Sequence, residues 1–221
     1  MVHSLTGQLL VASSLVTDPM YTGGVCLIVH HDETDLIGVM LNRPLKPTPG
    51  AIDMMIGESS HQKKPAFNAS KRLVSRTGKP GNKRTESRSQ TDEDLGNLIP
   101  WNILHFGGPL SGPVVAVHPI RQYGDVETGQ GIYLAAQKHL LEHLVREHEG
   151  PCRLIVGHLG WEVDQLREEM DQGYWHVLPA TAETVFSPAP EMWPRIIRQA
   201  TSGSLARWIG VKEVPEAADL N

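Results

Sequence analysis

The fold of this chain is decided by two apolar runs on either side of a polar turn: Val25-Cys26-Leu27-Ile28-Val29-His30-His31-Asp32-Glu33-Thr34-Asp35-Leu36-Ile37-Gly38-Val39-Met40-Leu41. Each run has the length of a strand and is rich in branched side chains. Residues 31–35 between them are polar. Two such runs around a short polar turn predict a β-hairpin, in which residues 25–30 pair antiparallel with residues 36–41.

Strand and helix patterns continue on both sides of the hairpin. Upstream, residues 7–12 form another short apolar run, and Asp18-Pro19 and Gly23-Gly24 mark turns before the hairpin. Downstream, the pattern predicts further strands at residues 102–106, 114–117, 153–156 and 175–178. It predicts helices at residues 49–56, 133–148, 161–170 and 191–200. Strands and helices mix without a regular βαβ alternation, which predicts an α+β fold.

Composition indicates a globular protein of the cytoplasm. The 221 residues are 40% hydrophobic, enough for one substantial core. No apolar run approaches the roughly 20 residues that span a bilayer, and the first residues resemble no signal peptide. Cys26 and Cys152 lie in or beside apolar strand patterns. They are therefore expected to be buried free thiols.

A basic segment interrupts this acidic chain. Residues 61–90 contain nine Lys or Arg and one acidic residue, so the segment is near +8, whereas the whole chain is −5. Residues 58–97 have almost no apolar periodicity and are predicted to be a mobile insertion, not a second domain. Its cations predict weak, sequence-independent and salt-sensitive contact with polyanions. The other interpretation is that the segment is only a solvated loop, and we favour this interpretation somewhat over polyanion contact.

The segment His139-Leu140-Leu141-Glu142-His143 has the spacing of an inverted zinc-protease motif. The two histidines are four residues apart, so they share a helical face. A catalytic zinc site also needs a third protein ligand, and only distant Glu213 and Glu216 offer one. We therefore predict a solvated polar face, with His139 and His143 largely exposed and no bound zinc.

Other chemistry has weaker signals. His31, His118 and His158 would suit a divalent metal if they met in space, but each is more often a structural histidine. No Gly-x-Ser-x-Gly motif is present, and no catalytic residue, metal or cofactor is predicted.

Two glycine-rich segments receive a structural interpretation first. Residues 157–160, Gly-His-Leu-Gly, are predicted to be a tight strand-to-helix turn, with Trp161 as a core anchor and an anion site at the helix start as the alternative. Residues 107–109, Gly-Gly-Pro, are predicted to be a turn or bulge, with the rim of a ligand site as the alternative.

Several strings along the chain together resemble the YqgE/AlgH family of bacterial proteins. They are residues 7–12 with Asp18-Pro19, the hairpin with His31 and Gly38, Asn42-Arg43-Pro44-Leu45, His105-Phe106-Gly107-Gly108-Pro109-Leu110, His118, residues 157–169, Trp175 and Trp193. The resemblance spans most of the chain except about residues 58–97 and the end. It departs at His158, where many relatives have a tyrosine. It implies one domain over residues 1–210, followed by a tail at 211–221. The implied fold is a curved, barrel-like, mostly antiparallel sheet with helices packed outside.

The family resemblance implies no settled activity. Relatives are often labelled transcriptional regulators. The sequence, however, shows no recognisable helix-turn-helix pattern, and its negative net charge argues against tight DNA binding. The first interpretation is a non-enzymatic interaction or regulatory protein with an unknown protein partner. The alternative is a small-ligand-binding protein or an enzyme with a groove rimmed by the His31, Gly-Gly-Pro, His118 and Gly-Trp segments. The residues of a ligand or partner groove are Asp18, His31, Asn42, Gly107, Gly108, Pro109, His118, Gly160, Trp161, Gln165 and Glu169.

Overall fold

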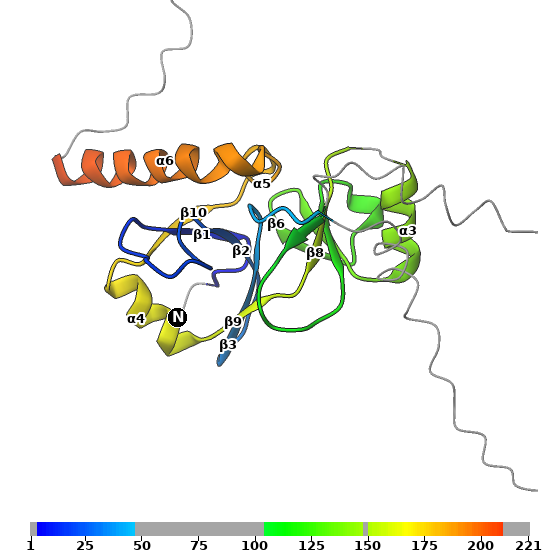
Figure 1. Cartoon of the computed structure of the whole chain (residues 1–221), viewed down its shortest axis with the longest axis horizontal. Helices are drawn as coiled ribbons and strands as arrows, with labels where there is room; N and C mark the ends of the chain where they lie inside the picture. The colour runs from blue at the N-terminus through cyan, green and yellow to red at the C-terminus, as the bar shows by residue number, and fades with distance from the viewer. Residues whose placement is uncertain (1–3, 47–103, 148–149, 210–221) are drawn as a thin grey trace, which may run out of the picture.

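The structure, a computed structural model, describes residues 4–46, 104–147 and 150–209. The helix predicted at 49–56, the basic segment within 58–97 and the tail from 211 lie outside these residues. Within the described residues the chain folds into two five-stranded sheets with helices packed against them (Figure 1). None of the helices in these ranges is long and apolar enough to cross a membrane.

The first sheet is antiparallel throughout and has the strand order β10-β1-β2-β3-β9. Its strands are β1 (Gln8–Ala12), β2 (Val25–His31), β3 (Asp35–Met40), β9 (Leu159–Glu162) and β10 (Trp175–Pro179). The predicted hairpin is confirmed, because Cys26 lies opposite Met40. Asp32 closes its turn by accepting hydrogen bonds from the backbone N–H groups of Thr34 and Asp35, each at 2.9 Å.

The second sheet has the strand order β4-β8-β5-β7-β6, with one parallel pair, β4 and β8. Its strands are β4 (Leu104–Phe106), β5 (Val115–His118), β6 (Val126–Gly129), β7 (Ile132–Ala135) and β8 (Arg153–Val156), and the short 3-10 helix η2 (Arg121–Tyr123) precedes β6. The α+β class and the mostly antiparallel pairing are confirmed. The strands form two sheets that do not close into a barrel.

The helices and sheets stack in layers, with three apolar clusters between them (Figure 1). The helices are α3 (Lys138–Glu147), α4 (Val163–Asp171), α5 (Ala182–Val185) and α6 (Ala189–Ile209). Leu166 of α4 is buried against one face of the first sheet. The opposite face packs on the second sheet and on Met192 and Ile196 of α6. Leu141 and Leu144 of α3 cover the outer face of the second sheet. The first sheet is therefore covered on both sides.

Two predicted helices begin later than the sequence pattern indicated, because strand pairing takes their first residues. Residues 132–135 form β7, which lies between β5 and β6, and α3 starts only at Lys138. The Asp125 carboxylate accepts hydrogen bonds from the N–H groups of Ala136 and Gln137 just before α3. Trp161 belongs to β9, where it lies opposite Leu36, and α4 starts at Val163. Residues 157–160 therefore lead into a strand, so the predicted strand-to-helix turn is wrong, and the alternative of an anion site loses the helix start on which it depended.

Candidate functional site

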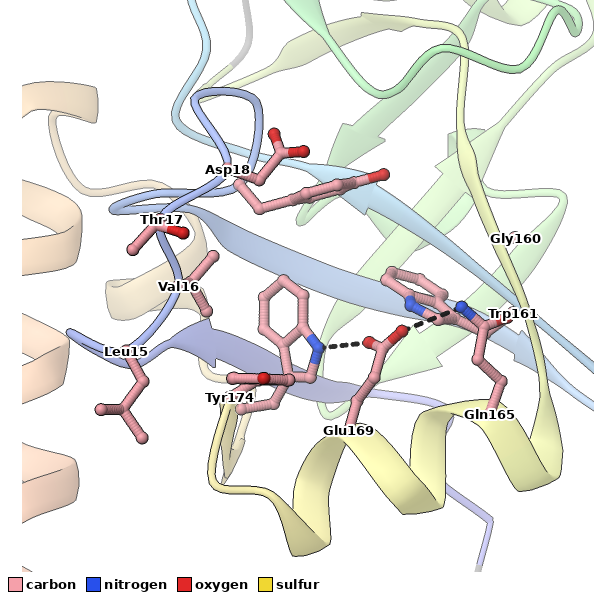
Figure 2. Close-up of a pocket in the computed structure, with 11 residues that line it drawn as sticks. Leu15, Val16, Thr17, Asp18, Gly160, Trp161, Gln165, Glu169 and Tyr174 are labelled. Carbon is pink, nitrogen blue, oxygen red and sulfur yellow. Dashed lines mark hydrogen bonds between the residues drawn. The ribbon is translucent and has the colours of Figure 1, made fainter.

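A cavity of about 340 Å³ lies between α4, the loop after β1 and the ends of β9 and β10 (Figure 2). We call it the α4 pocket. It is lined by Leu15, Val16, Thr17, Asp18, Tyr21, Gly160, Trp161, Gln165, Glu169, Tyr174 and Trp175. Five of the eleven residues predicted for a groove are among these: Asp18, Gly160, Trp161, Gln165 and Glu169.

Helix α4 presents polar side chains to this pocket because of its periodicity. Leu166 faces the sheet, whereas Gln165 and Glu169 are four residues apart and share a neighbouring face. Glu169 Oε1 accepts a hydrogen bond from Gln165 Nε2 at 2.9 Å, and Glu169 Oε2 accepts one from the indole N–H of Trp175 at 2.8 Å (Figure 2). The carboxylate is thus held in one position between a helix and a strand.

Three aromatic rings form the inner part of the pocket. The rings of Trp161 and Trp175 are 6.1 Å apart at 88°, and those of Tyr21 and Trp175 are 6.2 Å apart at 81°. These are edge-to-face contacts of the kind that stabilise aromatic clusters. Trp161 and Trp175 are each only 7% exposed and belong to the core between α4 and the first sheet. The inner wall of the pocket is therefore part of the core.

The charged side chains among the lining residues are both acidic. Asp18 comes from the loop after β1, and Glu169 comes from α4. Burial raises the pKa of Tyr21, and the nearby carboxylates of Asp18 and Glu169 raise it further. The phenol therefore lies in the negative potential of both acids, which act on one site.

Residues from the end of β3 hold the loop that carries Asp18 and Tyr21. The Asn42 side chain donates to the carbonyl oxygen of Gly23 at 2.8 Å and accepts from the N–H of Val25 at 3.0 Å. The Arg43 guanidinium donates to the carbonyl oxygen of Thr22 at 2.7 Å. Asn42, one of the predicted groove residues, therefore supports the pocket from outside it.

The motif glycines 107, 108 and 157 meet where the chain passes between the sheets, and we call this place the glycine crossing. A Cβ atom on Gly107 would lie 2.2 Å from the carbonyl oxygen of Gly157, and one on Gly108 would lie 2.2 Å from that of His158. Backbone hydrogen bonds join Leu110 and His158 in both directions, at 3.0 and 3.1 Å. Gly108 and Pro109 also line a smaller hollow of about 210 Å³. The glycines permit a close approach of the two backbone segments.

The remaining predicted residues lie apart from the α4 pocket. His31 Nδ1 accepts a hydrogen bond from the N–H of Leu5 at 2.8 Å, at the end of β2. His118 is fully buried in β5, and its Nδ1 accepts from the N–H of Ile120 at 3.3 Å. In the described ranges, no three His, Cys, Asp or Glu side chains converge as metal ligands, so His31, His118 and His158 do not form the cluster considered above.

The prediction for the zinc-like motif holds for one histidine and is wrong for the other. His139 is exposed on α3. His143 is half-buried, and its ring lies 4.2 Å from the ring of Tyr123, centroid to centroid. The sequence did not indicate this contact, because η2 reaches α3 only through the fold of the second sheet.

Sequence reasoning missed Tyr21, Tyr174 and the apolar rim of the pocket. Leu15 and Tyr174 are 59% and 37% exposed at its mouth. The sequence placed Trp175 in a predicted strand and among the family strings, but not in the groove. Its spacing of six residues from Glu169 was the available signal, because a short connection after α4 brings the indole N–H back to the carboxylate.

These features define a class of α+β protein in which two packed sheets carry an aromatic and acidic pocket under one helix. Residues 9–203 match the family model described as AlgH-like, and the chain belongs to this family.

Relatives and solved structures agree with this assignment. The chain is 30% identical to a UPF0301 protein of Streptomyces coelicolor, over 100% of this chain and 97% of that protein. It is also 30% identical to a UPF0301 protein of Streptomyces avermitilis, over 90% and 88%. The fold is similar to the solution structure of the AlgH protein from Pseudomonas aeruginosa, with a TM-score of 0.58, 19% identity and coverage of 97% of this chain and 100% of that one. A crystal structure of a Corynebacterium diphtheriae protein gives a TM-score of 0.60 at 20% identity, over 90% and 88%.

Proposed function

We propose that this protein is a non-enzymatic binding protein of the cytoplasm and that the α4 pocket is its recognition site. The observation that carries the proposal is the convergence of Asp18, Trp161, Gln165 and Glu169 on one cavity with Tyr21 and Trp175. A concave site with aromatic walls and a few oriented polar groups is the usual form of a ligand site. Occupation of this pocket would be the signal in a regulatory role.

The chemistry of the two cysteines supports binding over nucleophilic catalysis. Burial raises the pKa of the Cys26 thiol, and burial raises the pKa of Cys152 to about 12. A reactive cysteine needs the opposite, a lowered pKa and access to solvent. Both cysteines are free and suit packing roles in a reducing compartment.

The electrostatics of the pocket favour a ligand other than nucleic acid. Asp18 and Glu169 would repel phosphate groups, and their effect on Tyr21 indicates a negative potential inside the pocket. Any polyanion contact is therefore assigned to the basic segment at 61–90 and is expected to be weak. The pocket would take a small molecule or one side chain of a protein partner.

The proposal can be tested by nuclear magnetic resonance with a small set of cationic, neutral and anionic fragments. A ligand of the pocket should shift the indole N–H signals of Trp161 and Trp175. Trp193 is the internal control, since its indole donates to the carbonyl oxygen of Ala12 near α6, away from the pocket. Bound fragments should be recovered unchanged. Conversion of a fragment to a product, or binding that shifts only Trp193, would contradict the proposal.

A further inference from the structure

We infer that the α4 pocket binds an organic cation and that the recognised group is an alkylated ammonium. The inference rests on the proposal that this pocket is the ligand site, and it adds the chemical class of the ligand. It follows from three properties of the described lining residues: the arrangement of the rings, the sign of the charges and the number of free acceptors.

The rings are arranged as walls that meet at a corner. Trp161 and Tyr21 stand nearly perpendicular to Trp175, at 88° and 81°. A cation within about 6 Å of such rings is attracted to their negative faces, and tryptophan is the strongest partner. In each pair the edge of one ring covers a face of the other, so a compact cation would contact the remaining ring surfaces that line the pocket. Cages of this kind are a known way to recognise quaternary ammonium groups.

The charges around the rings have one sign. Among the described residues that line the pocket, Asp18 and Glu169 are the acidic ones, and none is Lys, Arg or His. The pKa of Tyr21 is raised by burial and by both carboxylates, so the interior already favours positive charge. An anionic ligand would meet two carboxylates and no cationic side chain among the lining residues that the structure describes.

The acceptors favour an alkylated ammonium over a metal ion or a bare amine. Each oxygen of Glu169 already accepts a hydrogen bond, one from Gln165 and one from Trp175. Glu169 therefore offers charge with part of its acceptor capacity already used. Hard metal ions need several oxygen ligands, and no three metal-binding side chains converge in the described residues. The apolar rim formed by Leu15, Val16 and Tyr174 suits N-alkyl groups.

The experiment compares choline with 3,3-dimethylbutan-1-ol, its neutral isostere, on the full chain. Binding is measured by intrinsic tryptophan fluorescence and by the indole N–H signals of Trp161 and Trp175. Choline should bind about tenfold more tightly than the isostere, which corresponds to about 1.4 kcal/mol. Tetramethylammonium should compete with choline. A short peptide with a trimethyllysine is compared with choline. Tighter binding of the peptide would indicate that the cation belongs to a protein partner, and tighter binding of choline would indicate a free small molecule.

Variants that remove the charge but keep the acceptors for Trp175 and Met20 provide the second arm. Glu169→Gln keeps an acceptor for the Trp175 indole, and Asp18→Asn keeps an acceptor for the Met20 N–H, which Asp18 binds at 2.7 Å. Each should weaken choline several-fold and leave the isostere unchanged. The matched control is Glu168→Gln, because Glu168 is exposed on the same helix and does not line the pocket. Thermal melting of each variant checks its fold.

The outcomes separate this inference from the proposed function. Equal affinity for choline and the isostere, or tighter binding of anions, would overturn the cation inference and leave the pocket as a ligand site. If the folded protein binds neutral fragments in the pocket but no cation, the cation inference is also overturned and the pocket remains a ligand site. If no fragment of any charge shifts Trp161 or Trp175, both ideas fail.

Discussion

The glycine crossing and the α4 pocket both contain motif residues, but these residues serve different purposes. At the crossing, Gly107, Gly108 and Gly157 are explained by the fold, because a Cβ atom on any of them would overlap backbone atoms of the facing turn. In the pocket, the carboxylate of Glu169 is oriented by two hydrogen bonds toward a cavity lined by aromatic rings. A motif residue is therefore a guide to function only when the backbone geometry does not already explain it.

The largest expected effect lies at the crossing. Gly157 has a φ of +76°, and its Cβ would lie 2.2 Å from the carbonyl oxygen of Gly108, so Gly157→Ala should cost about 4 kcal/mol or prevent folding. Gly131→Ala is the matched control, because Gly131 has a φ of +71° with nothing within 4 Å of its Cβ. It should cost only about 1–2 kcal/mol of backbone strain. If urea denaturation shows that the two variants lose the same free energy of unfolding, the close backbone approach is not the reason that position 157 requires glycine.

Trp161 tests whether the two regions can be separated at all, because it is both a core residue and a wall of the pocket. Trp161→Ala should lower the free energy of unfolding by about 3–5 kcal/mol, as large aromatic truncations do. Tyr174→Ala, at the exposed rim, should change it by no more than about 1 kcal/mol. A Trp161→Ala protein with unchanged melting and lost ligand binding would place Trp161 on the functional side alone.

His118, which lies in β5 away from the α4 pocket, is expected to make the stability of the fold depend on pH. Burial lowers the pKa of His118, and the nearby Asp125 carboxylate offsets only part of this. Below the ordinary histidine pKa of about 6.5, the unfolded chain binds a proton that the folded chain resists, so stability falls as pH falls toward the lowered pKa, by at most about 1.4 kcal/mol per pH unit. Urea midpoints between pH 7 and 5 should fall less in His118→Asn, whose amide oxygen can replace Nδ1 as acceptor for Ile120. If the urea midpoints of the unchanged protein and of His118→Asn fall equally between pH 7 and 5, His118 is not the cause of the pH dependence.

The smallest effect on stability is expected for Glu169→Gln. The glutamine retains an acceptor for Trp175, so the free energy of unfolding should change by less than about 1 kcal/mol. The pKa of Tyr21 should fall toward its ordinary value, because one of the carboxylates that raise it is gone. Phenolate absorbance against pH measures this, with Glu168→Gln as the control. A large loss of stability would instead make Glu169 a framework residue like the crossing glycines.

Much of the fold was predictable because it depends on local pattern. The hairpin of β2 and β3 follows from two apolar runs and a polar turn, and β8 was predicted at its observed bounds, Arg153–Val156. Strand β7 was missed because its residues also fit a helical pattern. Its place between β5 and β6 depends on partners that periodicity does not reveal.

The candidate site was predictable residue by residue but not as a site. Family strings singled out Asp18, Trp161, Gln165 and Glu169, and Gln165 and Glu169 are four residues apart, which places them on one face of α4. The same reasoning grouped them with His31, Asn42 and His118, which the structure places elsewhere.

The sequence by itself determined the β2–β3 hairpin, the bounds of β8 and the helical face shared by Gln165 and Glu169, because side-chain periodicity acts over a few residues. Only the tertiary structure decided that Tyr21, Trp161 and Trp175 enclose Glu169. These residues come from a loop and from β9 and β10, the two edge strands in the order β10-β1-β2-β3-β9, and they meet on the face of the sheet that α4 covers. That order reflects the burial of both faces of a sheet, a property of the whole chain and not of any one segment.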